Sequence, residues 1–290
     1  MNNPLFRPPA EAESLILQVD RGCPYNRCTF CGMYKGLRYH RRPIGEIRAL
    51  AQRECSAYPH AQRVFLADGD VMRRPFDELQ AILTMLNEHL PRLSRVSLYA
   101  NGSSIAGKSE DQLCALRLLK LHTLYMGLES GDEDILQRCR KGETAAQMVD
   151  AGIAAQSAGL RMSVMILLGL GGSDHTAEHV THTAAALNRM QPRLLSALRV
   201  IPVEGTELHA DAVSGRFHQL TEYQVVRELR ELIGRLELTG TVFRANHSSN
   251  VIPLEARFPR DRERLLAELD SLLASDRLDR LTPGPMPFWL

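Results

Sequence analysis

The chain has 290 residues, of which 44 % are hydrophobic and 24 % charged, and its net charge is +1. This is the composition of a globular protein with a large core, for which we expect one barrel-sized domain rather than two smaller ones. The near-zero charge argues against nucleic acid as a partner. Because the sequence has no signal-peptide pattern and no apolar run near the ~18 residues of a membrane span, we expect a cytoplasmic protein without a membrane partner.

Strand-like apolar runs alternate with amphipathic stretches through residues 14–208. The apolar runs predict six strands, at residues 14–19, 63–67, 95–100, 123–128, 161–168 and 194–201. The amphipathic stretches predict helices at residues 43–58, 77–90, 109–119, 133–140, 145–158 and 176–190. This alternation predicts a parallel sheet, with polar and glycine residues at the carboxyl ends of the strands where functional groups are expected.

The pattern changes beyond residue 208. A helix is expected at residues 222–236, an apparent strand begins at Thr241, and a last helix is expected at residues 261–273. The Pro-rich end that follows is expected to be partly disordered. We therefore divide the chain into an N-terminal extension (1–13), an α/β core (14–208) and a C-terminal extension (209–290) that packs on the core.

Three cysteines directly follow the first predicted strand. Cys23, Cys28 and Cys31 form a C-x4-C-x2-C array, and three thiols within nine residues predict a metal site. No fourth cysteine follows at short spacing, so a 4Fe–4S cluster held here would keep one iron open for a small molecule. The remaining cysteines lie in predicted helices; they are Cys55, Cys114 and Cys139.

Two other interpretations of the array remain open. A zinc site would need a fourth ligand such as His40. A disulfide framework suits small secreted domains, which this chain does not resemble.

The cysteine array resembles the cluster-binding loop of the radical S-adenosylmethionine (SAM) enzymes. The usual spacing there is C-x3-C-x2-C, and this loop has one extra residue between Cys23 and Cys28. The resemblance covers about residues 14–208 and implies a partial (β/α)6 TIM-like barrel of parallel strands, followed by a C-terminal α/β extension. Residues 125–132, 140–142 and 166–172 are most similar to the group that contains the oxygen-independent coproporphyrinogen III oxidases.

The resemblance implies a function. Cys23, Cys28 and Cys31 would hold one 4Fe–4S cluster, and the open iron would take SAM. One electron from a flavodoxin- or ferredoxin-like donor would cleave SAM to methionine and a 5'-deoxyadenosyl radical, which would abstract hydrogen from a small-molecule substrate. The protein would position and shield these groups while the cofactor performs the difficult step.

By the same resemblance, SAM would be contacted by residues near the strand ends. Phe30 occupies the position that lies near the adenine. Asp68 and Asp70 lie where the SAM amino group is received, and these residues would otherwise only shape a turn. Asn101 and Glu129 are candidates for the ribose hydroxyls.

Lys141 stands where a basic residue meets the SAM carboxylate, although a lysine at a helix end is also commonly just solvated.

In the tail, a polar segment follows the apparent strand, and polar clusters on loops favour function. Arg199, His247 and Asn250 are therefore expected to border the substrate.

Three further histidines, His175, His179 and His182, share one face of a predicted helix and form either a second metal site or a polar helix face. Two other functions also remain open. The chain could be a radical SAM enzyme that modifies tRNA, or a non-catalytic protein that uses its cluster to bind and deliver haem or a metal.

Overall fold

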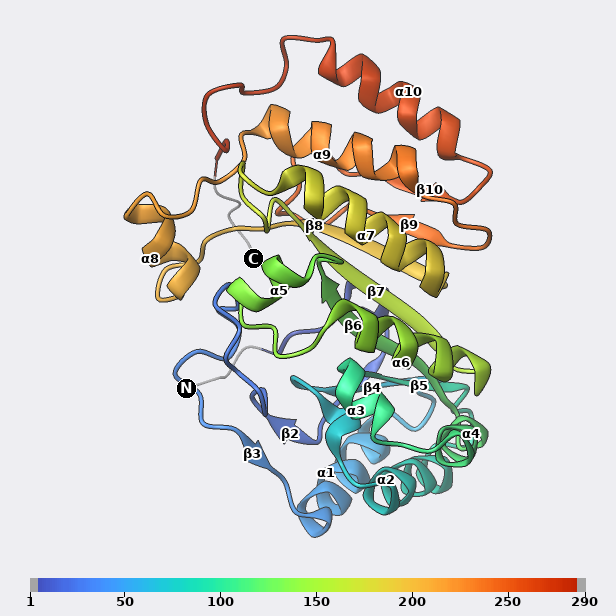
Figure 1. Cartoon of the computed structure of the whole chain (residues 1–290). Coiled ribbons are helices and arrows are strands. Elements are labelled where there is room, and N and C mark those ends of the chain that lie inside the picture. Colours follow the sequence, from blue (N-terminus) through green and yellow to red (C-terminus); the bar gives the residue numbers. More distant parts are fainter. Residues whose placement is uncertain (1–4, 286–290) are drawn as a thin grey trace. The chain divides into compact units, whose positions relative to one another are not determined.

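The structure, a computed structural model, describes residues 5–285. Residues 1–4 and 286–290, which end the two expected extensions, lie outside the described residues. The chain forms two compact units, drawn in Figure 1 and treated separately below. Unit 1 contains the residues up to Asn26, Met33–Met126 and Asp150–Met162. Unit 2 contains Arg27–Gly32, Gly127–Val149 and the residues from Ser163 onward.

The strands confirm the predicted α/β class, because the eight strands of the larger sheet are mostly parallel. In unit 1 the strand order is β1-β4-β5 followed by the first part of β6, and in unit 2 it is β7-β8-β9 (Val242–Arg244)-β10 (Glu255–Arg257). All six predicted strands are present, and only β6 extends beyond its predicted range. Their bounds are β1 Leu15–Gln18, β4 Arg63–Ala67, β5 Arg95–Tyr99, β6 Leu121–Glu129, β7 Arg161–Leu168 and β8 Leu194–Arg199.

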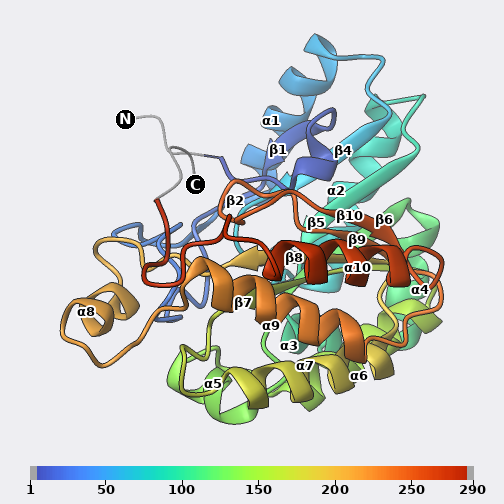
Figure 2. The same ribbon diagram turned by 90° about the horizontal axis from the view of Figure 1, so that it is seen from above.

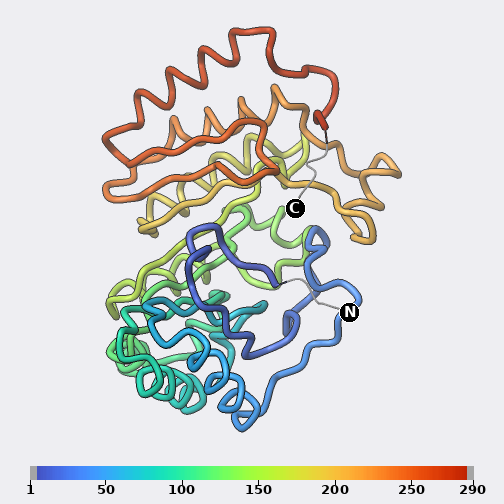
Figure 3. The backbone as a smooth tube through the Cα atoms, turned by 180° about the vertical axis from the view of Figure 1, so that it is seen from behind, coloured from blue at the N-terminus to red at the C-terminus, as the bar shows by residue number. Residues whose placement is uncertain are grey.

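Unit 1 is built on parallel pairing of β1, β4 and β5, in which Leu17 lies opposite Leu66 and Leu66 opposite Leu98. All three leucines are buried. Helices α1 (Ile44–Ala57) and α2 (Phe76–His89) pack together, as Figure 3 shows. The apolar face of α2 recurs at helical spacing and is buried; it consists of Leu79, Ile82, Leu83 and Leu86.

In unit 2, β7 pairs with β8, β8 pairs in parallel with β9 (Val242–Arg244), and β9 pairs antiparallel with β10 (Glu255–Arg257). Helices α7 (Thr176–Met190), α9 (Glu222–Arg235) and α10 (Arg262–Leu273) form a row, since α9 packs against both of the others (Figure 2). Two further helices lie earlier in this part of the chain, α5 (Glu133–Arg138) and α6 (Ala145–Ser157), and α6 runs on into unit 1.

Local capping signals place several helix ends where the sequence predicts them. Ser109 caps α4 (Glu110–Leu118) through a capping box with Gln112, as the sequence predicts for Ser109. Gly159, the predicted stop after α6, adopts a φ of +82°. The elements that the sequence did not predict are short: η1 (Pro9–Glu11), β2 (Asp20–Arg21), β3 (His40–Arg41), η2 (Val71–Arg73), α3 (Gly102–Ala106), α8 (Glu207–Val213) and β10.

As far as residue 285, the tail is attached to the start of α9; the rest of the Pro-rich end, which was expected to be partly disordered, lies outside the described residues. The backbone N–H groups of Glu222 and Tyr223, at the start of α9, donate to the carbonyls of Thr282 and Asp279. The guanidinium of Arg280 lies 4.0 Å from the centre of the Tyr223 ring. The tail therefore satisfies amide groups that the first turn of α9 would otherwise leave unpaired.

No helix within residues 5–285 combines the length and the apolar content needed to cross a membrane.

Candidate functional site

Cys23 lies in unit 1 against the segment that follows β4. Gly22, just before it, has a φ of +83°, which glycine adopts at little cost. The N–H of Gly69 donates to the carbonyl of Gly22 at 3.2 Å. A Cβ atom on Gly69 would lie 2.5 Å from the Cα of Cys23, closer than any real contact. Position 69 therefore needs glycine because the cysteine loop packs directly on it.

Asp68 is buried and accepts hydrogen bonds from the cysteine loop and from the end of β1 before it. Its Oδ2 accepts from the Gln18 side chain at 2.8 Å and from the Gly22 N–H at 3.3 Å, and its Oδ1 accepts from the Tyr34 hydroxyl at 3.3 Å. Burial raises the pKa of Asp68, and these hydrogen bonds offset part of the shift. The residue also holds a φ of +82°, unusual for a residue with a side chain. Its carboxylate thus faces the cysteine loop.

Asp70 and Asn101, two of the residues expected to contact SAM, lie together after β4 and β5. The Oδ1 of Asp70 accepts from the Ser104 hydroxyl at 2.8 Å and from the Asn101 N–H at 3.3 Å. Its Oδ2 accepts from the Asn101 side chain at 3.3 Å. Ser104 and Asn101 also form a capping box at the start of α3. This cluster gathers buried oxygen acceptors at the carboxyl edge of the unit 1 strands.

Cys28 and Cys31 belong to unit 2, where Thr29 fixes the backbone between them. The N–H of Thr29 donates to the carbonyl of Cys139 at 2.9 Å, and its carbonyl accepts from the N–H of Leu208 at 3.0 Å. The Cys31 N–H donates to the Cys28 carbonyl at 3.4 Å. These bonds attach the second half of the cysteine array to the end of α5 and the start of α8.

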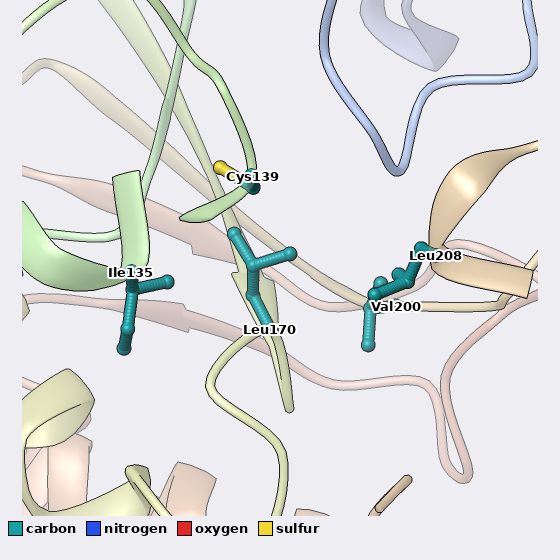
Figure 4. Packing of buried hydrophobic residues seen from close by; sticks show 5 residues of the cluster. All are labelled: Ile135, Cys139, Leu170, Val200 and Leu208. Carbon is teal, nitrogen blue, oxygen red and sulfur yellow. The ribbon is translucent and has the colours of Figure 1, made fainter. Parts of the chain in front are cut away.

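Phe30 packs against a buried apolar cluster of unit 2, shown in Figure 4. The cluster draws its side chains from α5 and its end, from the loop after β7, from the residue after β8 and from α8. Its buried members are Ile135, Cys139, Leu170, Val200 and Leu208. Phe30 itself is only partly buried, so part of the ring is left accessible.

Glu129 and Lys141 form a buried ion pair in unit 2, with 3.1 Å between Glu129 Oε1 and Lys141 Nζ. The two side chains are 12 % and 8 % exposed. Burial alone lowers the pKa of Lys141, but the Glu129 carboxylate and the Cys28 thiol outweigh it, so the pKa is raised and the ammonium persists. A Cβ on Gly127 would overlap Glu129 Oε1 and lie 3.1 Å from Lys141 Nζ. The missing side chain at residue 127 is what makes room for the pair.

A second buried acidic group supports the glycine run that follows β7. Glu228 of α9 is fully buried, and its Oε1 accepts from the N–H of Gly169 at 2.6 Å. Burial raises the pKa of Glu228 to about 7. His179 Nε2 lies 3.7 Å from the same carboxylate, and burial lowers the pKa of His179 to about 4. Both groups are therefore favoured in their neutral forms.

This arrangement predicts a specific pH dependence. A raised carboxyl pKa stabilises the fold below the unfolded value of about 4.5, and the stabilisation is lost as pH rises through about 7. Glu228→Gln keeps an acceptor for the Gly169 N–H but cannot ionise. Its free energy of unfolding relative to that of the parent should therefore rise by on the order of 1–3 kcal/mol between pH 5 and pH 8. Urea unfolding at both pH values checks this. Equal gains at the two would contradict it.

The three helix-face histidines have separate partners. His175 contacts Arg138, His179 bonds to Ser130 at 2.9 Å, and His182 bonds to Asp132 at 2.6 Å. Only His179 of the three is buried. Within residues 5–285, no three His, Cys, Asp or Glu side chains converge on a position for one metal ion. His40, the fourth ligand considered for zinc, lies exposed in β3.

The three residues expected near the substrate all form hydrogen bonds within the chain in unit 2. Arg199, at the end of β8, donates to the carbonyls of Pro283 and Pro285 in the tail. Asn250 donates to the carbonyl of Ala197 at 2.8 Å. The Nδ1 atom of His247 bonds to the hydroxyl of Ser249 at 2.9 Å, and burial lowers the pKa of this histidine.

The sequence reasoning missed Ser104, Tyr34 and Glu228. Ser104 had a usable signal, since it follows Asn101 at the spacing of a helix cap. Glu228 had a weaker one, as an acidic residue among the buried apolar positions of α9. Tyr34 had none, because its contact with Asp68 joins residues 34 positions apart.

The model of the radical SAM superfamily matches residues 17–184, which is more than half of the chain. The chain belongs to the radical SAM superfamily. No curated protein matches the sequence. For this radical SAM chain, solved structures are similar at low sequence identity, and they show its fold.

Three of these structures show how widely the fold is shared. Coproporphyrinogen III oxidase (HemN) from Escherichia coli, a radical SAM enzyme, is 17 % identical with a TM-score of 0.58 over 76 % of this chain and 51 % of its own. Methylornithine synthase (PylB) is 16 % identical, with a TM-score of 0.54 over 89 % of this chain and 81 % of its own. Archaeal Elp3 from Methanocaldococcus infernus is 14 % identical, with a TM-score of 0.54 over 78 % of this chain and 59 % of its own.

This radical SAM chain thus spans 51 % of the HemN chain and 59 % of the Elp3 chain. The likeness confirms the predicted fold class, an α/β fold of the TIM-like partial-barrel type.

The donor groups fit the cluster that this superfamily uses. None of the six cysteines, all of which the structure describes, is in a disulfide, and Cys23, Cys28 and Cys31 are each partly accessible. Cys139 is buried, and burial raises its pKa to about 12, with a further contribution from Cys28. It is therefore kept as a neutral thiol, whereas a cluster ligand must be a thiolate.

Proposed function

We propose that this protein is an enzyme that holds one 4Fe–4S cluster through Cys23, Cys28 and Cys31, binds SAM and abstracts hydrogen from a small-molecule substrate. The observation that carries the proposal is the three-cysteine loop, packed on Gly69 and anchored through Thr29, in a chain of the radical SAM superfamily. When bound, the reduced cluster supplies the electron that cleaves SAM to methionine and a 5'-deoxyadenosyl radical.

The chain's own residues would bind and orient SAM. Asp70, with Asn101 beside it, offers oxygen acceptors suited to the ammonium and the ribose hydroxyls. Lys141 keeps its positive charge and suits the carboxylate, while Glu129 is a further partner for the ribose. The accessible part of Phe30 suits the adenine ring.

From the sequence, Asp68 was expected to contact the SAM amino group together with Asp70, but its hydrogen bonds suggest a different role. Its carboxylate accepts three hydrogen bonds from the chain, and all of them come from the cysteine loop or the strand before it. We infer that Asp68 orients Cys23 rather than touching SAM. Asp70 then remains as the residue for the amino group.

The remaining partners are also proposals. A flavodoxin- or ferredoxin-like protein would supply the electron, and Arg199, His247 and Asn250 would border the substrate. The division into residues 1–13, 14–208 and 209–290 remains our interpretation of the chain.

Anaerobic reconstitution tests the function. The full chain is loaded with iron and sulfide, given SAM and dithionite, and assayed for 5'-deoxyadenosine by mass spectrometry. Cys28→Ala is expected to lose production entirely, whereas Cys114→Ala, in α4, should match the parent. Formation of a cluster without cleavage of SAM would favour the cofactor-delivery function. Zinc as the sole metal would refute the proposal, and co-purifying tRNA would point to tRNA modification.

A further inference from the structure

The loop that carries the cysteines is closed at its base by a very short stem. Strands β2 and β3 pair antiparallel, with Asp20 opposite Arg41 and Arg21 opposite His40. Two residue pairs give little stability on their own, because even longer isolated hairpins are only marginally stable in water. The eighteen residues between the two strands, 22–39, need a further fixed point if the thiols are to stay in place.

Arg74, which follows η2, provides that point from outside the loop. Its Nη2 donates to the Val19 carbonyl at 2.8 Å and to Asp20 Oδ1 at 2.6 Å, both at the start of the stem. The same nitrogen lies 2.9 Å from the carbonyl of Arg42, at the end of the stem. One guanidinium therefore contacts both sides of the loop base, and its side chain is only 1 % exposed.

The clamp is held from a helix as well. Nη1 of Arg74 pairs with Glu78 in α2 at 2.8 Å, and Glu78 also pairs with Arg41 in the stem. Arginine suits this position because its planar fork carries five donors, and lysine, with a single nitrogen, cannot reach all of these acceptors at once. Loss of the guanidinium would leave the buried Asp20 carboxylate without its cation.

We propose that Arg74 is a positioning residue that keeps the stem of the cysteine loop closed, so that the three thiols retain their cluster. The second part of this inference rests on the proposed function, while stem closure stands independently of it. Arg74→Met removes the charge at similar size, and Arg74→Lys keeps the charge with fewer bonds. Asn87→Ala is the matched control, because Asn87 also joins two backbone carbonyls in unit 1, those of Leu83 and Leu119, far along the chain from the stem.

Two measurements on the full chain test the proposal. Hydrogen–deuterium exchange without added iron should be at least about tenfold faster in residues 20–42 of Arg74→Met and unchanged in α4. After reconstitution, transfer of iron to a chelator should be at least about tenfold faster, with Arg74→Lys between Arg74→Met and the parent and Asn87→Ala like the parent.

Each outcome decides something. Parental exchange in residues 20–42 of Arg74→Met, or equal acceleration in Asn87→Ala, would overturn the clamp. Faster exchange with parental iron loss would overturn its role in cluster retention. If the parent takes up no cluster, the proposed function fails while exchange still decides stem closure. Should Arg74→Met not fold, Arg74→Lys against the parent makes the same comparison.

Discussion

Gly69→Ala is expected to abolish cluster loading. The new Cβ would lie 2.5 Å from the Cα and 2.6 Å from the Cβ of Cys23. Both are atoms of fixed position in the loop, so neither can swing away as a long side chain would, and the backbone around Cys23 must move. Because ligand positions must be held to about 0.5 Å, the thiolate would no longer meet its iron. Iron and sulfide content after reconstitution, together with the electron paramagnetic resonance of the reduced protein, would check this.

Gly45→Ala is the matched control for that variant. Gly45 lies in α1 of the same unit, and an added Cβ there meets nothing within 4 Å. Alanine also has the higher helix propensity, so this protein should load its cluster normally and be slightly more stable. Parental iron content in Gly69→Ala would show that Cys23 does not depend on the close packing at residue 69.

The second large effect is expected at the buried pair of Glu129 and Lys141. Lys141→Met leaves the Glu129 carboxylate buried and unpaired, and Glu129→Gln does the same to the Lys141 ammonium. Each single change should lower the free energy of unfolding by about 3–5 kcal/mol. The double variant carries no unpaired charge, so it should recover most of this loss. Denaturant unfolding of the four proteins completes the cycle.

The double variant also separates stability from function. If Lys141 and Glu129 bind SAM, the double variant should be stable but should produce at least about tenfold less 5'-deoxyadenosine than the parent at limiting SAM. If the double variant lost as much free energy of unfolding as the two single variants lose together, the pairing of Glu129 and Lys141 would be refuted. Parental activity of a stable double variant would instead refute the SAM contact while leaving the ion pair intact.

The sequence was most informative where a pattern is local and long. The apolar alternation predicted β4 and β7 at their observed bounds, and it predicted α7 as well, because fifteen residues show several helical turns. Short elements such as β2 and α3 escaped because a few residues cannot display a period. The cysteine array was visible because its ligands lie within nine residues of each other.

Contacts between distant residues were not accessible in the same way. Arg74 meets Asp20 across 54 positions, and Glu228 meets Gly169 across 59. Nothing in the spacing of either pair marks it, since such contacts follow from packing of the sheet and its helices. The expected role of Arg199 beside the substrate was likewise inferred from the sequence, whereas its hydrogen bonds to the tail depend on where residues 283–285 return.

The attachment of the tail to α9 has a consequence for biosynthesis. The first amide groups of α9 are paired with the carbonyls of Asp279 and Thr282, and Arg199 of β8 is paired with those of Pro283 and Pro285. Domains usually fold as their residues emerge from the ribosome. Unit 2 cannot complete these contacts until residue 285 has emerged, so its final folding step comes after Cys23, Cys28 and Cys31 have already left the ribosome.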